Sequence, residues 1–152
     1  MDAHPEFAEA MATNGHVSPA AAKLRDEVYD LSLIPEEMRL DYSEYPREAT
    51  KPNQELMDIM EPYLMNPEFA PMMRRNLSGL PPTLVVTVQF DILRDEGIVY
   101  AKRLEKAGVP TKWLHIETGF HGGLNFYAFF NAAQSAIDEC SEWIREHMAK
   151  DI

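Results

Sequence analysis

Apolar, mostly β-branched residues run without interruption from Leu84 to Val88, directly behind two consecutive prolines. A short run of this kind is typical of a strand that is buried on both faces, as in a parallel sheet. A second run within Lys112–Ile116 indicates another strand, and the apolar residues of Asp95–Ala107 between them recur at helical spacing. The pattern predicts a strand–helix–strand unit, whose strands must pair in parallel through a right-handed crossover.

Aromatic and aliphatic positions near the C-terminus also recur at helical spacing. Phe126, Phe129 and Phe130 begin a stripe that continues at every third or fourth position to Ile144 and beyond. Such a stripe marks the buried face of an amphipathic helix. We therefore expect one long helix over Asn125–Lys150, with these aromatic side chains in the core.

The first 80 residues carry no strong strand pattern. Ser18 followed by Pro19 is a typical helix start, because serine caps the first turn and proline fits its first position. This predicts a helix over Ala20–Tyr29, and Asn53 is expected to cap a second, short helix over Gln54–Met60. Prolines and polar residues between these helices favour loops.

The chain thus divides into two predicted segments. Residues 1–80 form a cap-like segment of helices and loops, and residues 81–152 form an α/β core segment. Only two strands are predicted, and a two-stranded parallel sheet leaves long edges unpaired and is marginal on its own. The pattern therefore indicates that this chain is part of a larger α/β fold.

Composition and charge exclude several classes of function. The net charge is −11, and nucleic acid needs a basic face, so no nucleic-acid partner is expected. No apolar run approaches the ~18 residues of a membrane-spanning helix, so no transmembrane segment is expected. Cys140 is the only cysteine, and its place in a helical apolar stripe favours a packing role. No residues are spaced as a metal site or a phosphate-binding loop, so neither a metal nor a cofactor is expected.

Two titratable residues follow the two predicted strands. Asp91 comes after the first strand, and His121 comes after the second in a glycine-rich loop. Side chains at the C-terminal ends of adjacent parallel strands, ~4.8 Å apart, share the sheet edge at which α/β proteins place their sites. A carboxylate beside a histidine fixes the ring tautomer and stabilises its cation. The pattern therefore predicts that Asp91 and His121 are the acid and base of a Ser-His-Asp charge system.

Each residue also has an ordinary structural explanation. An aspartate at a strand end commonly forms a turn or caps a helix, and a histidine among glycines is commonly solvated. Only the joint pattern favours catalysis. The neighbouring Asp95 and Glu96 fit the first turn of the predicted helix, and Arg94 is expected to pair with a nearby carboxylate.

Over residues 80–127 the chain resembles the hormone-sensitive-lipase branch of the α/β-hydrolases. The resemblance is carried by Phe90-Asp91-Ile92-Leu93-Arg94-Asp95-Glu96-Gly97, by Ala107-Gly108-Val109-Pro110 and by Gly119-Phe120-His121-Gly122. The last motif is most similar to the arylacetamide deacetylase and neutral cholesterol ester hydrolase group. Residues 14–19 and 31–36 resemble, more weakly, the part of that group that contributes to a lid-like cap. Thr118 departs from the group, which often has an acidic residue at that place.

The resemblance implies a fold and a chemistry. The fold is α/β, the C-terminal part of an α/β-hydrolase with its last parallel strands and helices, preceded by the cap-like segment. The implied activity is that of a serine carboxylic ester hydrolase (an esterase, lipase or deacetylase) acting on a small apolar ester or amide. Asp91 would be the catalytic triad acid and His121 the triad base.

The resemblance also implies parts that this sequence does not contain. Such enzymes place the nucleophile in Gly-x-Ser-x-Gly on a strand-to-helix turn and oxyanion donors in His-Gly-Gly-Gly, and the chain order is Ser, Asp, His. Neither motif occurs in the 152 residues. We therefore expect the serine to lie before Met1, together with most of the sheet. The isolated chain is expected to be inactive and to need that N-terminal part.

Two other functions stay open. The chain could be an inactive relative that serves as a binding or interaction module, pairing its open sheet edge with another chain. A peptidase of the same fold shares the order of Asp before His, although the residues from Asp91 to Gly97 favour the esterase branch. The compartment is open too, since the resemblance is compatible with the cytoplasm and with the luminal side of the endoplasmic reticulum.

Overall fold

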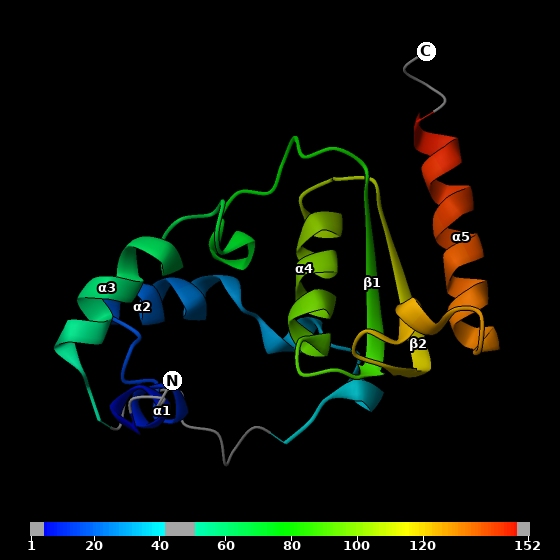
Figure 1. Cartoon of the computed structure of the whole chain (residues 1–152). Coiled ribbons are helices and arrows are strands. Elements are labelled where there is room, and N and C mark those ends of the chain that lie inside the picture. The colour runs from blue at the N-terminus through cyan, green and yellow to red at the C-terminus, as the bar shows by residue number, and fades with distance from the viewer. Residues whose placement is uncertain (1–4, 42–50, 149–152) are drawn as a thin grey trace. The chain divides into compact units, whose positions relative to one another are not determined.

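A computed structural model describes residues 5–41 and 51–148 (Figure 1). The chain divides into two compact units, Met1–Arg75 and Asn76–Ile152. Each unit has its own helices, and the sheet lies in the second unit. The described residues therefore form two structural bodies, which are taken one at a time below.

In its described residues, 5–41 and 51–75, the first unit contains three α-helices, α1 (Pro5–Ala12), α2 (Pro19–Val28) and α3 (Gln54–Leu64). Both predicted helices are present. The Ser18 side chain accepts from the Ala21 N–H and begins α2, and the Asn53 side chain accepts from the Leu56 N–H and begins α3. Short 3-10 helices follow at Leu31–Leu33, Glu36–Met38 and Pro71–Met73.

Two features of this unit differ from the sequence expectation. Helix α1 was not predicted from the sequence. It has only eight residues, and Ala10 is the one residue of this helix that is buried. Helix α3 runs four residues past the predicted end at Met60, and it contains Pro62. Proline lacks the main-chain N–H and favours a break in a helix, but α3 continues past Pro62 to Leu64.

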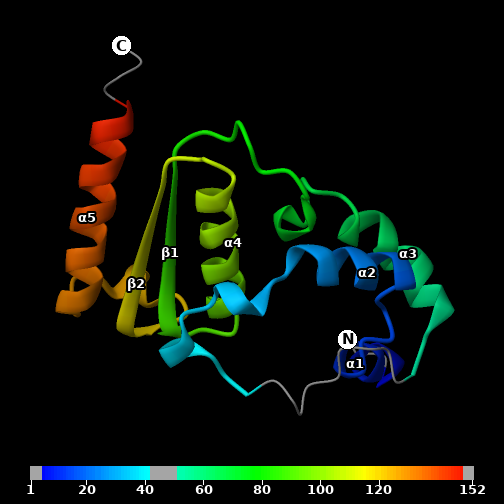
Figure 2. The same cartoon turned by 180° about the vertical axis from the view of Figure 1, so that it is seen from behind.

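The second unit is the predicted strand–helix–strand unit followed by a helix. Its elements are β1 (Thr83–Phe90), α4 (Arg94–Lys106), β2 (Thr111–Phe120) and α5 (Asn131–Met148). Strands β1 and β2 pair in parallel. Helices α4 and α5 lie on opposite faces of this sheet, as both views of the molecule show (Figures 1 and 2). The result is a three-layer α/β/α arrangement.

Alternating side chains explain this layering. On one face, Val88 and Ile116 form a buried cluster with Ala136 of α5. On the other face, Thr87 lies so close to Gly97 of α4 that a Cβ at position 97 would be 2.6 Å from the Thr87 Cγ2 atom. Because successive strand residues point to opposite faces, each strand contributes to both layers.

The ladder between the strands changes register near its C-terminal end. From Thr83 to Val88, each residue lies level with the residue 28 positions later, ending with Val88 level with Ile116. Phe90 then lies level with Phe120, which is 30 positions later. Strand β2 therefore carries two extra residues between these pairs, a bulge within residues 117–119.

The expected long C-terminal helix is wrong at its beginning. A 3-10 helix, η4, spans Gly123–Phe126, and α5 begins only at Asn131. Phe126, Phe129 and Phe130 therefore precede α5 and are exposed instead of lying in the core. Ring contacts explain the difference for two of them, since Phe126 and Phe130 each pack against Phe120 at the end of β2. The predicted helix end falls in residues 149–152, outside the described part of the chain.

Candidate active site

Asp91 lies directly after β1 and is held by the main chain. Its Oδ1 atom accepts from the Leu93 N–H at 2.9 Å, in a turn that leads into α4. This hydrogen bond is the main cause that lowers the pKa of Asp91 below its ordinary value. Partial burial opposes the shift, and the neighbouring His121 side chain adds to it. The main chain therefore favours the ionised form of this carboxyl group and fixes its orientation without any substrate.

His121 lies directly after β2 and meets Asp91 across the sheet edge. Its Nδ1 atom is 2.9 Å from the Asp91 Oδ2 atom. The His121 main-chain N–H donates to the Phe90 carbonyl at 3.1 Å, so the backbone is fixed as well as the ring. The histidine side chain is 70% exposed and the aspartate side chain 16%. After His121 the chain turns at Gly122, whose φ of 75° is a left-handed conformation that favours glycine.

This pair has the geometry of a histidine base with its orienting acid. A carboxylate accepts only, so the ring nitrogen that faces Asp91 must carry the proton. The other ring nitrogen of His121, Nε2, then keeps its lone pair and can accept a proton from a hydroxyl group. The exposed ring is accessible to such a group. The structure thus brings together the two residues that the sequence singled out, and the pair can act as a general base.

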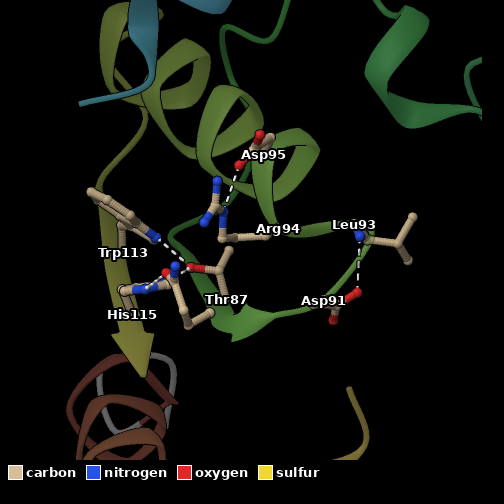
Figure 3. A network of polar contacts seen from close by, with 8 residues as sticks. Thr87, Asp91, Leu93, Arg94, Asp95, Trp113 and His115 are labelled. Atoms are coloured by element: carbon tan, nitrogen blue, oxygen red, sulfur yellow. Dashed lines mark hydrogen bonds and ion pairs between the residues drawn. The ribbon is translucent and has the colours of Figure 1, made fainter. Parts of the chain in front are cut away.

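The charged residues that follow Asp91 are structural. Arg94, Asp95 and Glu96 form the first turn of α4, and the Arg94 Nε atom donates to the Asp95 carboxylate at 2.6 Å (Figure 3). Both members of this ion pair are buried. Burial raises the pKa of Asp95 and of Glu96 above their ordinary values. The expected pairing of Arg94 with a carboxylate is confirmed.

A second polar cluster lies on the α4 face of the sheet and was not predicted (Figure 3). The Trp113 Nε1–H donates to Thr87 Oγ1 at 2.9 Å, and the Thr87 hydroxyl lies 2.9 Å from His115 Nδ1. His115 Nε2 faces Gln89 Oε1 at 3.3 Å, which assigns the ring proton to Nε2 and makes Nδ1 the acceptor of the Thr87 proton. Burial lowers the pKa of His115, and the charge of Arg94 acts in the same direction. The sequence contained no signal for this cluster, because only the strand register brings Thr87 level with His115 and within reach of Trp113.

Large apolar side chains next to Asp91 in the sequence, and others in the segment after His121, are exposed. Ile92 is 95% exposed, Phe90 69% and Phe129 81%. A pocket of about 240 Å³ lies on the α5 face of the sheet, and its lining includes Phe120 and Gly123, which flank His121 in the sequence. It is lined mainly by Val88, Ile116, Phe120, Leu124, Phe130 and Ala133. Large apolar side chains that are exposed next to a site are typical of a substrate or protein contact.

Other candidate chemistry is weak in the described part of the chain. Cys140 is half-buried in α5, and burial raises the pKa of its thiol, which disfavours the reactive thiolate. Within residues 5–41 and 51–148, no three His, Cys, Asp or Glu side chains are grouped as metal ligands. No helix in the same residues has both the length and the apolar character to cross a bilayer.

The comparisons with known proteins agree with one another on the family of this chain. Residues 9–125 match the family described as alpha/beta hydrolase fold. Mouse neutral cholesterol ester hydrolase 1 is 38% identical over 151 residues, covering 94% of this chain and 36% of the relative. Bovine arylacetamide deacetylase is 32% identical over 142 residues, covering 92% of this chain and 35% of the relative. The chain thus spans about a third of the length of these curated relatives.

A solved structure is similar as well. An esterase from Pyrobaculum calidifontis, in a monoclinic crystal form, superposes with a TM-score of 0.54 at 26% sequence identity. The superposition covers 91% of this chain and 50% of the esterase chain. These similarities agree with the group that the Gly119-Phe120-His121-Gly122 motif indicated.

Proposed function

The chain belongs to the alpha/beta hydrolase fold family, and we propose that it carries the acid and base of a serine carboxylic ester hydrolase. The observation that supports this most directly is the hydrogen bond of 2.9 Å between His121 Nδ1 and Asp91 Oδ2 at the C-terminal edge of the sheet. The names of the relatives point in the same direction, since they include an ester hydrolase, a deacetylase and an esterase.

In the proposed reaction, His121 Nε2 takes the proton of a serine hydroxyl while the serine oxygen attacks the carbonyl carbon of the substrate. Asp91 holds the Nδ1–H in place and stabilises the imidazolium that forms. When the tetrahedral intermediate collapses, His121 gives the proton to the leaving alcohol or amine. Water then hydrolyses the acyl-serine by the same steps, and the carboxylic acid leaves.

The serine and the oxyanion donors are proposed to come from polypeptide outside the 152 residues. The sequence contains neither Gly-x-Ser-x-Gly nor His-Gly-Gly-Gly, and the chain corresponds to about a third of its curated relatives. The exposed Phe90, Ile92 and Phe129 suit a surface that such polypeptide covers. On this proposal, the chain by itself has little or no turnover.

The substrate is proposed to be a small apolar ester or amide. The pocket on the α5 face of the sheet, whose lining includes Phe120 and Gly123, is formed mainly by aliphatic and aromatic side chains and has a volume of about 240 Å³, enough for a short acyl chain or a single ring. Few polar groups line it, and Thr118 and Asn131 are the ones able to orient a ligand. A charged substrate would be poorly solvated there.

A chimera tests the proposal. The 152 residues replace the matching third of mouse neutral cholesterol ester hydrolase 1, and hydrolysis of a p-nitrophenyl ester is compared with that relative and with the isolated chain. We expect turnover by the chimera and by the relative but not by the isolated chain, and a kcat about 10⁴-fold lower in the Asp91→Asn chimera, as for triad acids elsewhere. His121→Ala should abolish turnover, while His147→Gln, a histidine of α5 outside the pair, serves as the matched control.

Two results would contradict the proposal. A chimera that folds and reacts with a fluorophosphonate but keeps its activity in His121→Ala would exclude this histidine as the base. Ester hydrolysis by the isolated chain, abolished by His121→Ala, would show that no outside serine is needed. The exposed apolar side chains also favour a second function, an inactive interaction module, and a folded chimera with no turnover would support that function instead.

A further inference from the structure

The two extra residues in β2 change which residue lies level with Asp91. Up to Val88 the offset between paired residues is 28, and at Phe90 it is 30. With the offset of 30, Asp91 lies level with His121. If the offset of 28 continued, Asp91 would lie level with Gly119, and His121 would be level with Leu93.

The difference is large enough to decide whether the pair can form. Two strand residues correspond to about 6.6 Å along the strand, since each rises ~3.3 Å. A displacement of that size would take His121 Nδ1, now 2.9 Å from Asp91 Oδ2, out of hydrogen-bonding distance. An insertion of two residues also keeps the alternation of faces, whereas a single residue would reverse it. The bulge therefore moves His121 along the strand without turning it to the other face.

Gly119 is the residue that lets β2 follow this path. A Cβ at position 119 would lie 2.9 Å from both Cβ and Cγ1 of Val88, and 3.1 Å from Cγ2 of Ile116. Distances below 3.0 Å are not tolerated, and both neighbours belong to strands with little freedom to move. The backbone at position 119 thus lies directly against the β1 side chain that precedes the register change.

We propose that Gly119 is a positioning residue, which sets the register of β2 so that His121 lies level with Asp91. Gly119 acts through its lack of a side chain, because a Cβ at this position would clash with Val88. The catalytic importance of this register rests on the proposed function, whereas the register itself is a property of the sheet. It also separates the roles of the motif glycines, because Gly122 serves the turn after His121 while Gly119 serves the strand before it.

The test is a Gly119→Ala variant of the whole chain, read by NMR at the two side chains of the pair. Two-bond ¹H–¹⁵N spectra of the His121 ring report which nitrogen carries the proton, and ¹³C spectra report the pKa of Asp91. We expect the Nδ1–H form in the unmodified protein and its loss in Gly119→Ala. We also expect the pKa of Asp91 to rise but to stay below its ordinary value, because the Leu93 N–H still lowers it.

Two glycine variants serve as matched controls. In Gly123→Ala, in the same segment, the new methyl group would be 3.6 Å from the Phe120 ring, an ordinary contact, and the pair should persist. In Gly97→Ala, the new methyl group would be 2.6 Å from Thr87 Cγ2, an equally severe clash that lies elsewhere in the same unit. This variant should lose stability but keep the Nδ1–H form of His121 in the folded protein. Loss of the pair in Gly97→Ala as well would overturn the proposal, because general destabilisation would then explain it.

If Gly119→Ala does not fold, a second variant tests the premise of the proposal, that the register of β2 sets the pair. Deleting Thr118 and Gly119 together adds no clash and leaves a ladder with the single offset of 28, in which His121 is again level with Asp91. We expect the deletion protein to keep the Nδ1–H signature. A folded deletion protein without it, a deletion protein that fails to fold, or a folded Gly119→Ala protein that keeps the pair would each overturn the proposal. None of these readouts depends on ester hydrolysis, so failure of the catalytic proposal would be seen separately, in the chimera assay.

Discussion

At the scale of single residues, the Asp91 carboxylate is held from two sides. One oxygen accepts from the Leu93 N–H and the other faces His121 Nδ1, each at 2.9 Å. The main-chain contact has the larger effect on the pKa of Asp91. The orientation of the acid is therefore largely a property of the turn that ends β1, and the histidine meets a carboxylate that is already in place.

This order of effects gives a first prediction. His121→Ala should raise the pKa of Asp91 only part of the way to its ordinary value, whereas Leu93→Pro, which removes the main-chain donor, should raise it further. A ¹³C titration of the carboxyl group in each variant measures both changes. A full return to the ordinary value in His121→Ala would contradict the prediction.

The sign of the pH dependence follows from the same shift. Because the pKa of Asp91 is lower in the folded state, the folded protein binds fewer protons than the unfolded chain at acid pH. The stabilisation from Asp91 is thus present above the unfolded pKa of ~3.9 and is lost as the pH falls through the lower folded pKa. Leu93→Pro should weaken this acid-limb dependence when urea unfolding is followed between neutral pH and pH 3.

Thr87 supports a second prediction at the residue scale. Its hydroxyl accepts from Trp113 and donates to His115 in a half-buried setting, so removing it leaves two polar groups without a partner. Thr87→Val, which keeps the shape, should lower the free energy of unfolding by ~1–3 kcal/mol. Thr87→Ser keeps the hydroxyl and is the control in denaturant unfolding. Because Thr87→Ser lacks the methyl group that lies against Gly97, its own loss measures that contact, and a loss in Thr87→Val no larger than the loss in Thr87→Ser would contradict the prediction.

At the scale of elements, the helices of the first unit begin where their caps lie. Ser18 and Asn53 each accept from a main-chain N–H three residues later and are directly followed by α2 and α3. Such a contact satisfies a donor that the helix itself cannot satisfy. These starts were predictable because a cap acts over three residues and needs no tertiary information.

The cap of α2 gives the prediction for this scale. Ser18→Ala should lower the free energy of unfolding by about 1 kcal/mol, because the Ala21 N–H loses its acceptor in a buried position. Ser18→Asp keeps an acceptor and serves as the control. Helix content by circular dichroism and the urea midpoint measure the effect, and an unchanged midpoint in Ser18→Ala would contradict it.

At the scale of the whole molecule, the contacts that build the pair all lie in the second unit. They include the ladder between β1 and β2, the Gly119 approach to Val88 and the packing of α4 and α5 on the sheet. Leu77, near the beginning of this unit, belongs to a buried cluster with Leu104 and Val109. The predicted boundary after residue 80 would separate Leu77 from that cluster.

This arrangement gives the last prediction. A chain limited to residues 76–152 should keep the Nδ1–H signature of His121, because the pair and the main-chain groups that hold it, at Leu93 and Phe90, belong to this unit. A chain limited to 81–152 should be less stable by ~2–5 kcal/mol, since it lacks Leu77, which is 2% exposed. Thermal unfolding compares the two chains. Equal stability of the two chains would instead support the predicted boundary between residues 80 and 81.

Much of the second unit was predictable from local patterns. The β-branched run at Leu84–Val88, the helical spacing of Asp95–Ala107 and the parallel pairing all follow from short-range periodicity, and the structure confirms them. The comparisons confirm the expected α/β-hydrolase class and the expected group of relatives. The same reasoning failed at Phe126, Phe129 and Phe130, where helical spacing is present but α5 has not yet begun. Ring packing against Phe120 decides that segment, and spacing along the chain does not record it.

The sequence by itself therefore determined the strands, the helix caps and the positions of Asp91 and His121 at strand ends, because each depends on residues close in the chain. Tertiary structure decided the register that makes Asp91 level with His121, and it decided the contact of Thr87 with His115 and Trp113. These depend on how two strands about 30 residues apart align. A shift of two residues moves a side chain by about 6.6 Å, which is more than a hydrogen bond can span.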